Sequence, residues 1–209
     1  MLNTNFAILG SFIVVLGGLS YLIDTIKGKV KPNKVTYVCW SIAPLIAFFA
    51  EIRQGVGIQS LVTFMFGFIP LLIFLSSFIN KEADWKLNKF DLVCGSFSLF
   101  GLLLWYITKS GNIAILLSIF ADFLASFPTI VKSFNFPETE NAWPYGASVI
   151  SVILTVFTLK HWNFSNIGFL FYISIISLVI YILIQFKVGN LYTDFIKRNR
   201  QATLVGTEK

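Results

Sequence analysis

The sequence predicts an all-α integral membrane protein with seven transmembrane helices, arranged as two parallel three-helix repeats joined by a linker helix. Hydrophobic residues make up 56% of its 209 residues and charged residues only 12%, which is more apolar surface than a water-soluble domain of this size can bury. Seven apolar runs are long enough to cross a hydrocarbon layer of about 30 Å as single helices. A pattern of polar residues also returns after about 105 positions.

The predicted spans follow one another with short polar connections. They cover residues 5–25, 34–52, 56–79, 89–108, 112–132, 142–159 and 163–187. The first span lacks a basic leader and a cleavage pattern, so we expect it to be retained as a helix. Pro44 lies inside the second span and should kink it, which neighbouring helices tolerate in a membrane. The fourth span has no counterpart in either repeat and is expected to link two units of the same orientation.

This organisation divides the chain into four parts. Residues 1–80 form the first three-helix repeat, and residues 81–110 form a linker that contains the fourth helix. Residues 111–187 form the second three-helix repeat, and residues 188–209 form a basic cytoplasmic tail.

The net charge of +6 is distributed asymmetrically between the two sides of the predicted membrane protein. With seven spans, thirteen of the sixteen Lys and Arg residues fall on the side that holds the C-terminus. The positive-inside bias therefore predicts an outer N-terminus and a cytoplasmic C-terminus in the plasma (inner) membrane. The basic tail is expected to contact anionic headgroups of the inner leaflet, and nucleic acid is not an expected partner.

The repeat is carried by polar residues of the first and fifth spans. A shift of about 105 residues places Gly17 over Asp122, Tyr21 over Ser126 and Asp24 over Thr129. The sixth and seventh spans carry further polar stripes at helical spacing, which include Ser148, Ser177 and Tyr181. Such stripes would converge on one polar interior between the repeats, as in many secondary transporters.

Asp122 is the strongest single signal in the sequence. A carboxylate at mid-bilayer costs about 2.5 to 3.5 kcal/mol, so it should face the bundle interior and have a partner. It is expected to bind a ligand or a proton, and the alternative is a structural acid that is hydrogen-bonded to a facing Ser or Tyr. Asp24 lies nearer to the basic turn, where it is expected to form a gate or an ion pair with Lys27 or Lys31.

Trp40 and Tyr145 occupy matching positions early in the second helix of each repeat. They are expected either to stack on a planar or sugar-like solute from opposite sides or to pack near the cytoplasmic interface. The full set of expected substrate-binding residues is Trp40, Asp122, Ser126, Tyr145, Ser148, Ser177 and Tyr181. The neutral members of this set could also serve only as contacts between helices.

Residues 127–148, FPTIVKSFNFPETENAWPYGAS, resemble the PQ-loop superfamily, which includes the seven-helix SWEET sugar transporters and their three-helix SemiSWEET relatives. Pro128 and Thr129 stand in place of the family's Pro-Gln pair, Lys132 follows in the basic turn, and Pro144 is the second proline. The first unit has Ile-Asp at the Pro-Gln place, with a proline further on. The resemblance implies that the prolines act as flex points between the two bundles. The full set of expected gate or hinge residues is Tyr21, Asp24, Pro44, Pro128, Thr129 and Pro144.

The resemblance implies a transporter that moves a small polar, sugar-like solute by alternating access, and Asp122 is the residue expected to link it to protons. The asparagines that sugar carriers place on the third helix of each unit are absent from residues 63–74 and 168–179. Two alternatives stay open: a non-transporting membrane receptor or scaffold of this fold, and a vitamin-precursor transporter of the nicotinamide riboside type. The Trp-x-x-x-Trp-x-x-x-Asn signature of the latter is also absent.

Enzyme activity and cofactors are not expected. The sequence has no HExxH or GxSxG motif, and no second intramembrane acid is expected at the depth of Asp122. Cys39 and Cys94 lie in apolar spans without a CxxC motif, so neither a disulfide nor a metal site is expected. His161 is the only histidine and is a poor metal ligand on its own. A homo-oligomer is compatible with the sequence.

Overall fold

The computed structural model describes residues 3–108 and 111–207, and these residues form helices, turns and loops without any strand. The α-helices are α1 Asn5–Ile26, α2 Lys34–Arg53, α3 Ser60–Ser76, α4 Lys89–Thr108, α5 Gly111–Asn135, α6 Trp143–Val156, α7 Phe164–Gln185 and α8 Val188–Thr207. Two short 3₁₀ turns, η1 Lys81–Ala83 and η2 Pro137–Thr139, precede α4 and α6. Each span expected from the sequence overlaps one of the helices α1 to α7, which confirms the all-α class.

In the part of the chain that the structure describes, four helices, α1, α2, α5 and α7, are long and apolar enough to cross a membrane. Helices α3 and α6 are equally apolar in character but shorter. Large hydrophobic side chains cover the outer surface of the bundle, as Phe12, Phe49 and Phe171 show with exposed fractions of 56%, 57% and 62%. A surface of this kind is stable in lipid rather than in water, so the chain is a helical membrane protein.

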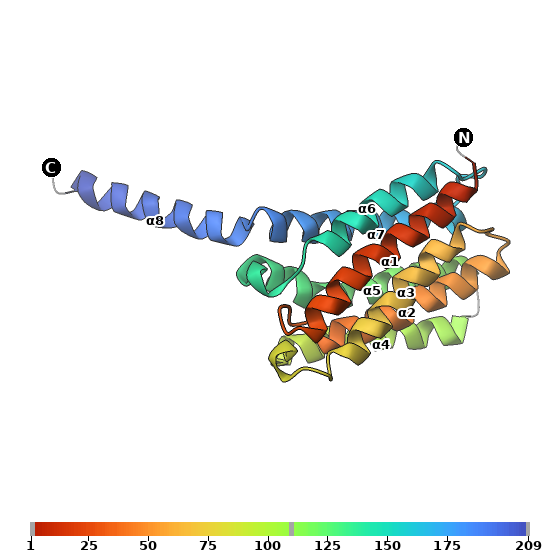
Figure 1. Ribbon diagram of the computed structural model, residues 1–209, viewed down its shortest axis with the longest axis horizontal. Helices are drawn as coiled ribbons and strands as arrows, with labels where there is room; N and C mark the ends of the chain where they lie inside the picture. Colours follow the sequence, from red (N-terminus) through yellow and green to blue (C-terminus); the bar gives the residue numbers. More distant parts are fainter. Residues whose placement is uncertain (1–2, 109–110, 208–209) are drawn as a thin grey trace.

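Some boundaries differ from the sequence-based expectation. Helix α3 covers only the centre of the run expected at 56–79, because the residues on both sides form turns. The tail is largely helical, since α8 continues to Thr207. Lys187 adopts a left-handed backbone conformation with φ of 48°, which separates α7 from α8. Helix α8 then extends away from the bundle (Figure 1).

The helices pack as two similar triplets. Helix α3 lies between α1 and α2 and packs against both, and α7 lies in the same way between α5 and α6. The triplets meet along two seams, one between α1 and α6 and the other between α2 and α5. Helix α4 packs on α5 and touches α2 (Figure 1). The space between the seams is therefore bounded by residues of both triplets.

Small residues bring α1 and α6 close together at their seam. A Cβ atom on Gly17 would lie 2.7 Å from the Cβ of Ala147 and 3.1 Å from the Cα of Pro144. A Cβ atom on Gly10 would lie 2.7 Å from the Thr155 hydroxyl oxygen. Helices in lipid associate mainly through such close packing, so these glycines hold the two triplets together.

We expect Gly17→Val to destabilise the protein by about 1 to 3 kcal/mol, because the added side chain overlaps backbone and side-chain atoms of α6. The midpoint of unfolding in a detergent titration, followed by tryptophan fluorescence, measures the effect. Leu16→Val is the matched control, because Leu16 directly precedes Gly17 in α1 and is 46% exposed. Equal stability of the two variants would show that the seam does not depend on this contact.

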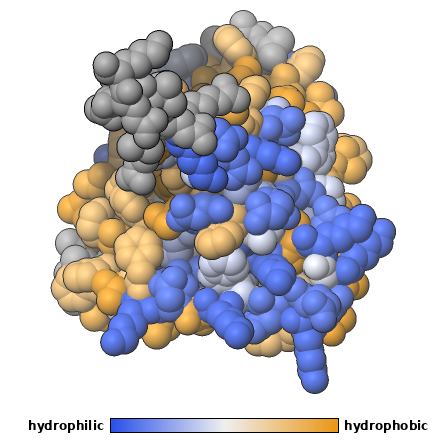
Figure 2. Space-filling model, turned by 90° about the vertical axis from the view of Figure 1, so that its left-hand side faces the viewer, coloured by the Kyte–Doolittle hydropathy of each residue, from blue (hydrophilic) through white to orange (hydrophobic). Residues whose placement is uncertain are grey.

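The connections α1–α2, α3–α4 and α5–α6 gather at one end of the bundle, which we call the basic end (residues 27–33, 77–88 and 136–142). The Lys31 amide donates to the Thr139 carbonyl oxygen at 3.0 Å, and the Asn80 side chain donates to the Ile26 carbonyl oxygen at 2.9 Å. Figure 2 shows hydrophilic residues over the middle of this end, with hydrophobic surface around them. The connections of the opposite end also touch, since Ser165 donates to the Gln54 side chain at 2.8 Å.

Candidate functional site

A cavity of about 80 Å³ lies between the two triplets. Each of the helices α1, α2, α3, α5, α6 and α7 contributes to its wall. Most of the lining is apolar and includes Val14, Phe66, Ile69, Ile173 and Ile176. Its polar and aromatic lining consists of Tyr37, Trp40, Asp122, Tyr145, Ser148 and Ser177. A space of this size holds two or three water molecules, at about 30 Å³ for each.

Five of the residues expected to bind substrate line this cavity: Trp40, Asp122, Tyr145, Ser148 and Ser177. The other two lie outside it. The Ser126 hydroxyl is turned back along α5 and donates to the Phe123 carbonyl oxygen at 2.6 Å. The Tyr181 ring lies against Gly146, where an added Cβ would be 3.0 Å from the ring. Ser126 therefore makes a contact within α5, and Tyr181 of α7 packs against α6.

Asp122 is fully buried and presents its two carboxyl oxygens differently. Its Oδ2 accepts a hydrogen bond of 2.7 Å from the hydroxyl of Tyr172 on α7. Its Oδ1 has no hydrogen-bond partner within the described part of the chain. A buried carboxyl group without a full set of partners is costly unless it binds a proton or a cation. Asp122 therefore gives the cavity a site at which either of these can be held.

Three aromatic residues form one wall of the cavity. The Trp40 ring stands edge-on to Tyr37 and Tyr145, with centroid distances of 5.5 Å and 6.3 Å and interplanar angles of 70° in both cases. The hydroxyl groups of Tyr37 and Tyr145 lie 3.5 Å apart. Trp40 and Tyr145 were expected to flank a solute from opposite sides. In the structure the two rings contact each other, as in the alternative expectation of aromatic packing, and their binding of a solute stays a prediction.

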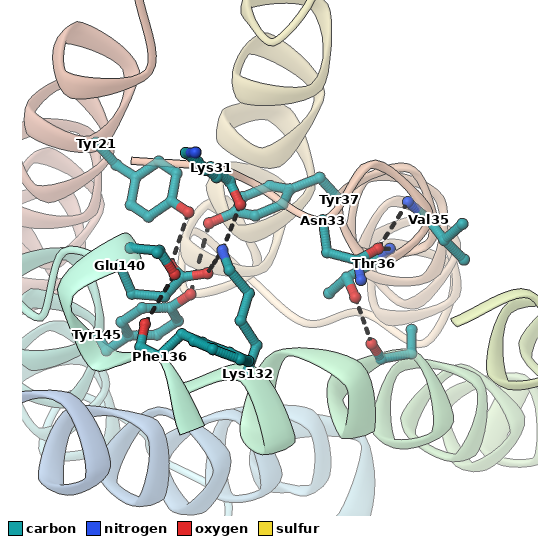
Figure 3. A network of polar contacts seen from close by, with 12 residues as sticks. Tyr21, Lys31, Asn33, Val35, Thr36, Tyr37, Lys132, Phe136, Glu140 and Tyr145 are labelled. Carbon is teal, nitrogen blue, oxygen red and sulfur yellow. Dashed lines mark hydrogen bonds and ion pairs between the residues drawn. The ribbon is translucent and has the colours of Figure 1, made fainter. Parts of the chain in front are cut away.

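A buried ion pair lies next to this wall at the basic end. Lys132 Nζ donates to Glu140 Oε1 at 2.6 Å, and the Tyr21 hydroxyl donates to Glu140 Oε2 at 2.7 Å (Figure 3). Lys132 also donates to the carbonyl oxygen of Lys31. The side chains of the pair are 1% and 0% exposed, so water contributes almost nothing to their solvation. We call Tyr21, Lys31, Lys132 and Glu140 the closing network.

The closing network separates the cavity from a second hollow. That hollow, of about 530 Å³, opens at the basic end and is lined by Asp24, Glu140 and Asn141, among others. On the cavity side, the Tyr21 ring lies 5.4 Å from the ring of Tyr37, which lines the cavity. Glu140 therefore borders the hollow with its side chain buried, and its partner Tyr21 packs against the aromatic wall.

The structure corrects the expectation for Asp24. Its Oδ2 accepts a hydrogen bond of 2.7 Å from Asn141, and no ion pair with Lys27 or Lys31 occurs among the described residues. The reason is that the connection before α6 folds back over the end of α1. This brings the Asn141 side chain within hydrogen-bond distance of Asp24. Asp24 still lines the hollow at the basic end.

The expected hinge residues occupy different environments. Pro44 and Pro128 are buried inside α2 and α5, where each removes one backbone hydrogen bond. Thr129 is buried, and its hydroxyl has no partner in the described residues. Pro144 lies in the first turn of α6, where proline starts a helix without kinking it. Its expected role as a flex point is therefore not supported by its position, and it lines the cavity instead.

Sequence reasoning missed four residues of this region. Tyr37 could have been found, because it lies one helical turn before Trp40 and shares its face. Tyr172 gave no signal that linked it to an aspartate fifty residues earlier. Lys132 was expected in a polar turn and Glu140 was not singled out, but α5 continues to Asn135 and buries the lysine. Glu51, near the end of α2, is also buried, with an exposed fraction of 2%.

Comparison with known protein families, with curated proteins and with solved structures finds no significant match. The function must therefore be inferred from the cavity, its carboxyl group and the closing network.

Proposed function

We propose that the chain is a transporter that moves a small polar solute across the plasma (inner) membrane by alternating access, with Asp122 linking transport to protons. The observation that carries the proposal is the position of Asp122. Asp122 lines a cavity between two helix triplets, one of its carboxyl oxygens has no partner among the described residues, and the closing network lies between that cavity and the hollow at the basic end. Secondary transporters place their sites in the same way, near the middle of the bundle at the junction of two repeats.

The packing supports an arrangement of two parallel repeats, α1–α3 and α5–α7, with α4 as the linker. Within each triplet the third helix lies between the first and the second, and the first helix of each triplet packs on the second helix of the other. This symmetry agrees with the resemblance to the PQ-loop superfamily. The excess of Lys and Arg at the basic end favours a cytoplasmic location for that end, with the N-terminus outside.

In this proposal the structure corresponds to a state closed toward the cytoplasm. The cavity of about 80 Å³ is smaller than the roughly 300 Å³ typical of ligand pockets, so the triplets must separate to admit a solute. Opening toward the basic end breaks the contacts of Glu140 with Tyr21 and Lys132. A solute shifts the balance between the two open states only through contacts that differ between them.

A membrane receptor of the same fold is the main alternative. It would bind a ligand in the same cavity without moving it, and a vitamin-precursor carrier would differ from a sugar carrier only in the solute. The described residues contain no group of His, Cys, Asp and Glu side chains arranged to hold a metal. The partners that the proposal names are the solute, protons and lipid.

Flux through purified protein in proteoliposomes tests the proposal. A thermal-shift screen with sugars, vitamins, amino acids and amines first identifies compounds that stabilise the protein, because a ligand stabilises the folded form that binds it. A radiolabelled hit should then enter loaded vesicles and exchange with unlabelled solute inside. Binding without exchange, at saturating solute and with either sign of pH gradient, would favour the receptor.

A further inference from the structure

Besides Asp122, the cavity offers a solute the Trp40 indole N–H, which has no partner among the described residues, and the Ser177 hydroxyl. The hydroxyl of Ser148 already donates to the Pro144 carbonyl oxygen at 2.8 Å, and the hydroxyl groups of Tyr37 and Tyr145 face each other. A solute with many hydroxyl groups would leave most of them unpaired, at a cost of about 1 to 3 kcal/mol for each buried group. This lining disfavours a sugar.

The same lining suits a positive charge. Asp122 is the only acidic or basic residue in the cavity wall, and its Oδ1 lacks a partner among the described residues. The buried pair of the closing network adds no net charge, because Lys132 is paired with Glu140. The mutually tilted rings of Tyr37, Trp40 and Tyr145 offer the kind of aromatic wall that attracts ammonium groups. Both features act on a cation in a site with little water.

The groups around Asp122 add no competing charge. Tyr172 of α7 donates to it, and Cys39 of α2 is a titratable group near enough to be affected by its charge. No charged side chain of α2, α4 or α7 in the described ranges lies against it. The Asp122 carboxyl group is therefore neutral when it holds a proton. Its ionisation in this buried position has a large cost unless a cation is bound beside it.

We propose that the cavity binds a small organic cation with an apolar body, such as a quaternary ammonium or a protonated amine, in exchange for the proton on Asp122. This inference rests on the proposed function and names its substrate class. When a monovalent cation binds, the Asp122 carboxyl group releases one proton to the solvent and the carboxylate pairs with the cation. When the cation leaves, one proton returns, so the cavity is neutral in both states. The apolar lining from Ile69, Ile173 and Ile176 surrounds the body of the solute.

Radiolabelled benzyltrimethylammonium is the probe, because its charge is permanent and its body is apolar. We expect the purified full-length protein to bind it and to release about one proton per bound cation, measured with a pH dye in weak buffer. Asp122→Asn should weaken binding at least 30-fold, and Trp40→Leu about 5- to 30-fold, which corresponds to a lost cation–π contact. Glu51→Gln is the matched control, because Glu51 is a buried carboxyl group that does not line the cavity. It should change binding less than 3-fold.

The outcomes separate this inference from the proposed function. Binding with proton release but without exchange across proteoliposomes would support the cation site and overturn transport. Exchange of glucose without binding of the probe would support transport and overturn the cation site. Unchanged probe affinity in a folded Asp122→Asn protein, or no binding of the probe to the wild type, would also overturn the cation site.

Discussion

Replacing Glu140 with glutamine is expected to lower the free energy of unfolding by about 3 to 5 kcal/mol, because it leaves the buried ammonium of Lys132 without its counter-charge. The other direct contacts of the Lys132 ammonium carry no negative charge. They are the Lys31 carbonyl oxygen and the ring of Trp85, which lies 4.7 Å from the ammonium. The loss should appear in an SDS titration of the detergent-solubilised protein, followed by fluorescence.

The double variant Lys132→Met with Glu140→Gln distinguishes a charge effect from a packing effect. Replacement of both members of a buried pair is often nearly neutral, so the double variant should recover most of the stability lost by Glu140→Gln alone. Glu138→Gln is the matched control, because Glu138 belongs to the same connection but is exposed. A single variant as stable as the control would show that the closing network does not hold the basic end together.

Replacing Asp122 with asparagine is expected to remove the effect of a proton gradient on solute flux, because asparagine keeps the shape of the side chain but holds no titratable proton. Tyr172 can still donate to the amide oxygen, so the fold should survive. Flux of the identified solute in proteoliposomes, with and without a pH difference of two units, measures the change. We expect stimulation of about tenfold or more in the wild type and none in the variant, since two pH units correspond to about 2.7 kcal/mol per proton.

Glu51→Gln again provides the control for this experiment. Glu51 is buried in α2 with one oxygen bound to Thr63 at 3.2 Å and the other without a partner in the described residues. If proton dependence persists in Asp122→Asn and disappears in Glu51→Gln, the proton site has been assigned to the wrong carboxyl group.

The helices could be located from the sequence because each apolar run of about 20 residues can satisfy its own backbone in lipid only as a helix. The positions of Trp40, Asp122, Ser148 and Ser177 were also accessible, since polar side chains in apolar helices must face the interior. These residues share the wall of one cavity in the structure. Their roles in binding remain a prediction.

The closing network could not be found from the sequence, for a physical reason. Glu140 lies in a polar connection that is typical of a solvated turn, and its burial depends on how that connection folds back over α1. The pairing of Asp122 with Tyr172 likewise depends on how α7 is rotated and placed against α5, which the sequence of neither helix alone encodes. Contacts between helices of this kind follow from packing geometry rather than from local pattern.

Access to the cavity from the two sides of the membrane tests the central claim most directly. Ser148→Cys, in a background that carries Cys39→Ala and Cys94→Ala, places one thiol in the cavity wall. A membrane-impermeant thiol reagent should label it in both right-side-out and inverted vesicles, and solute should slow the labelling from both sides. Labelling from one side only, whatever the solute or pH, would contradict alternating access between the two triplets.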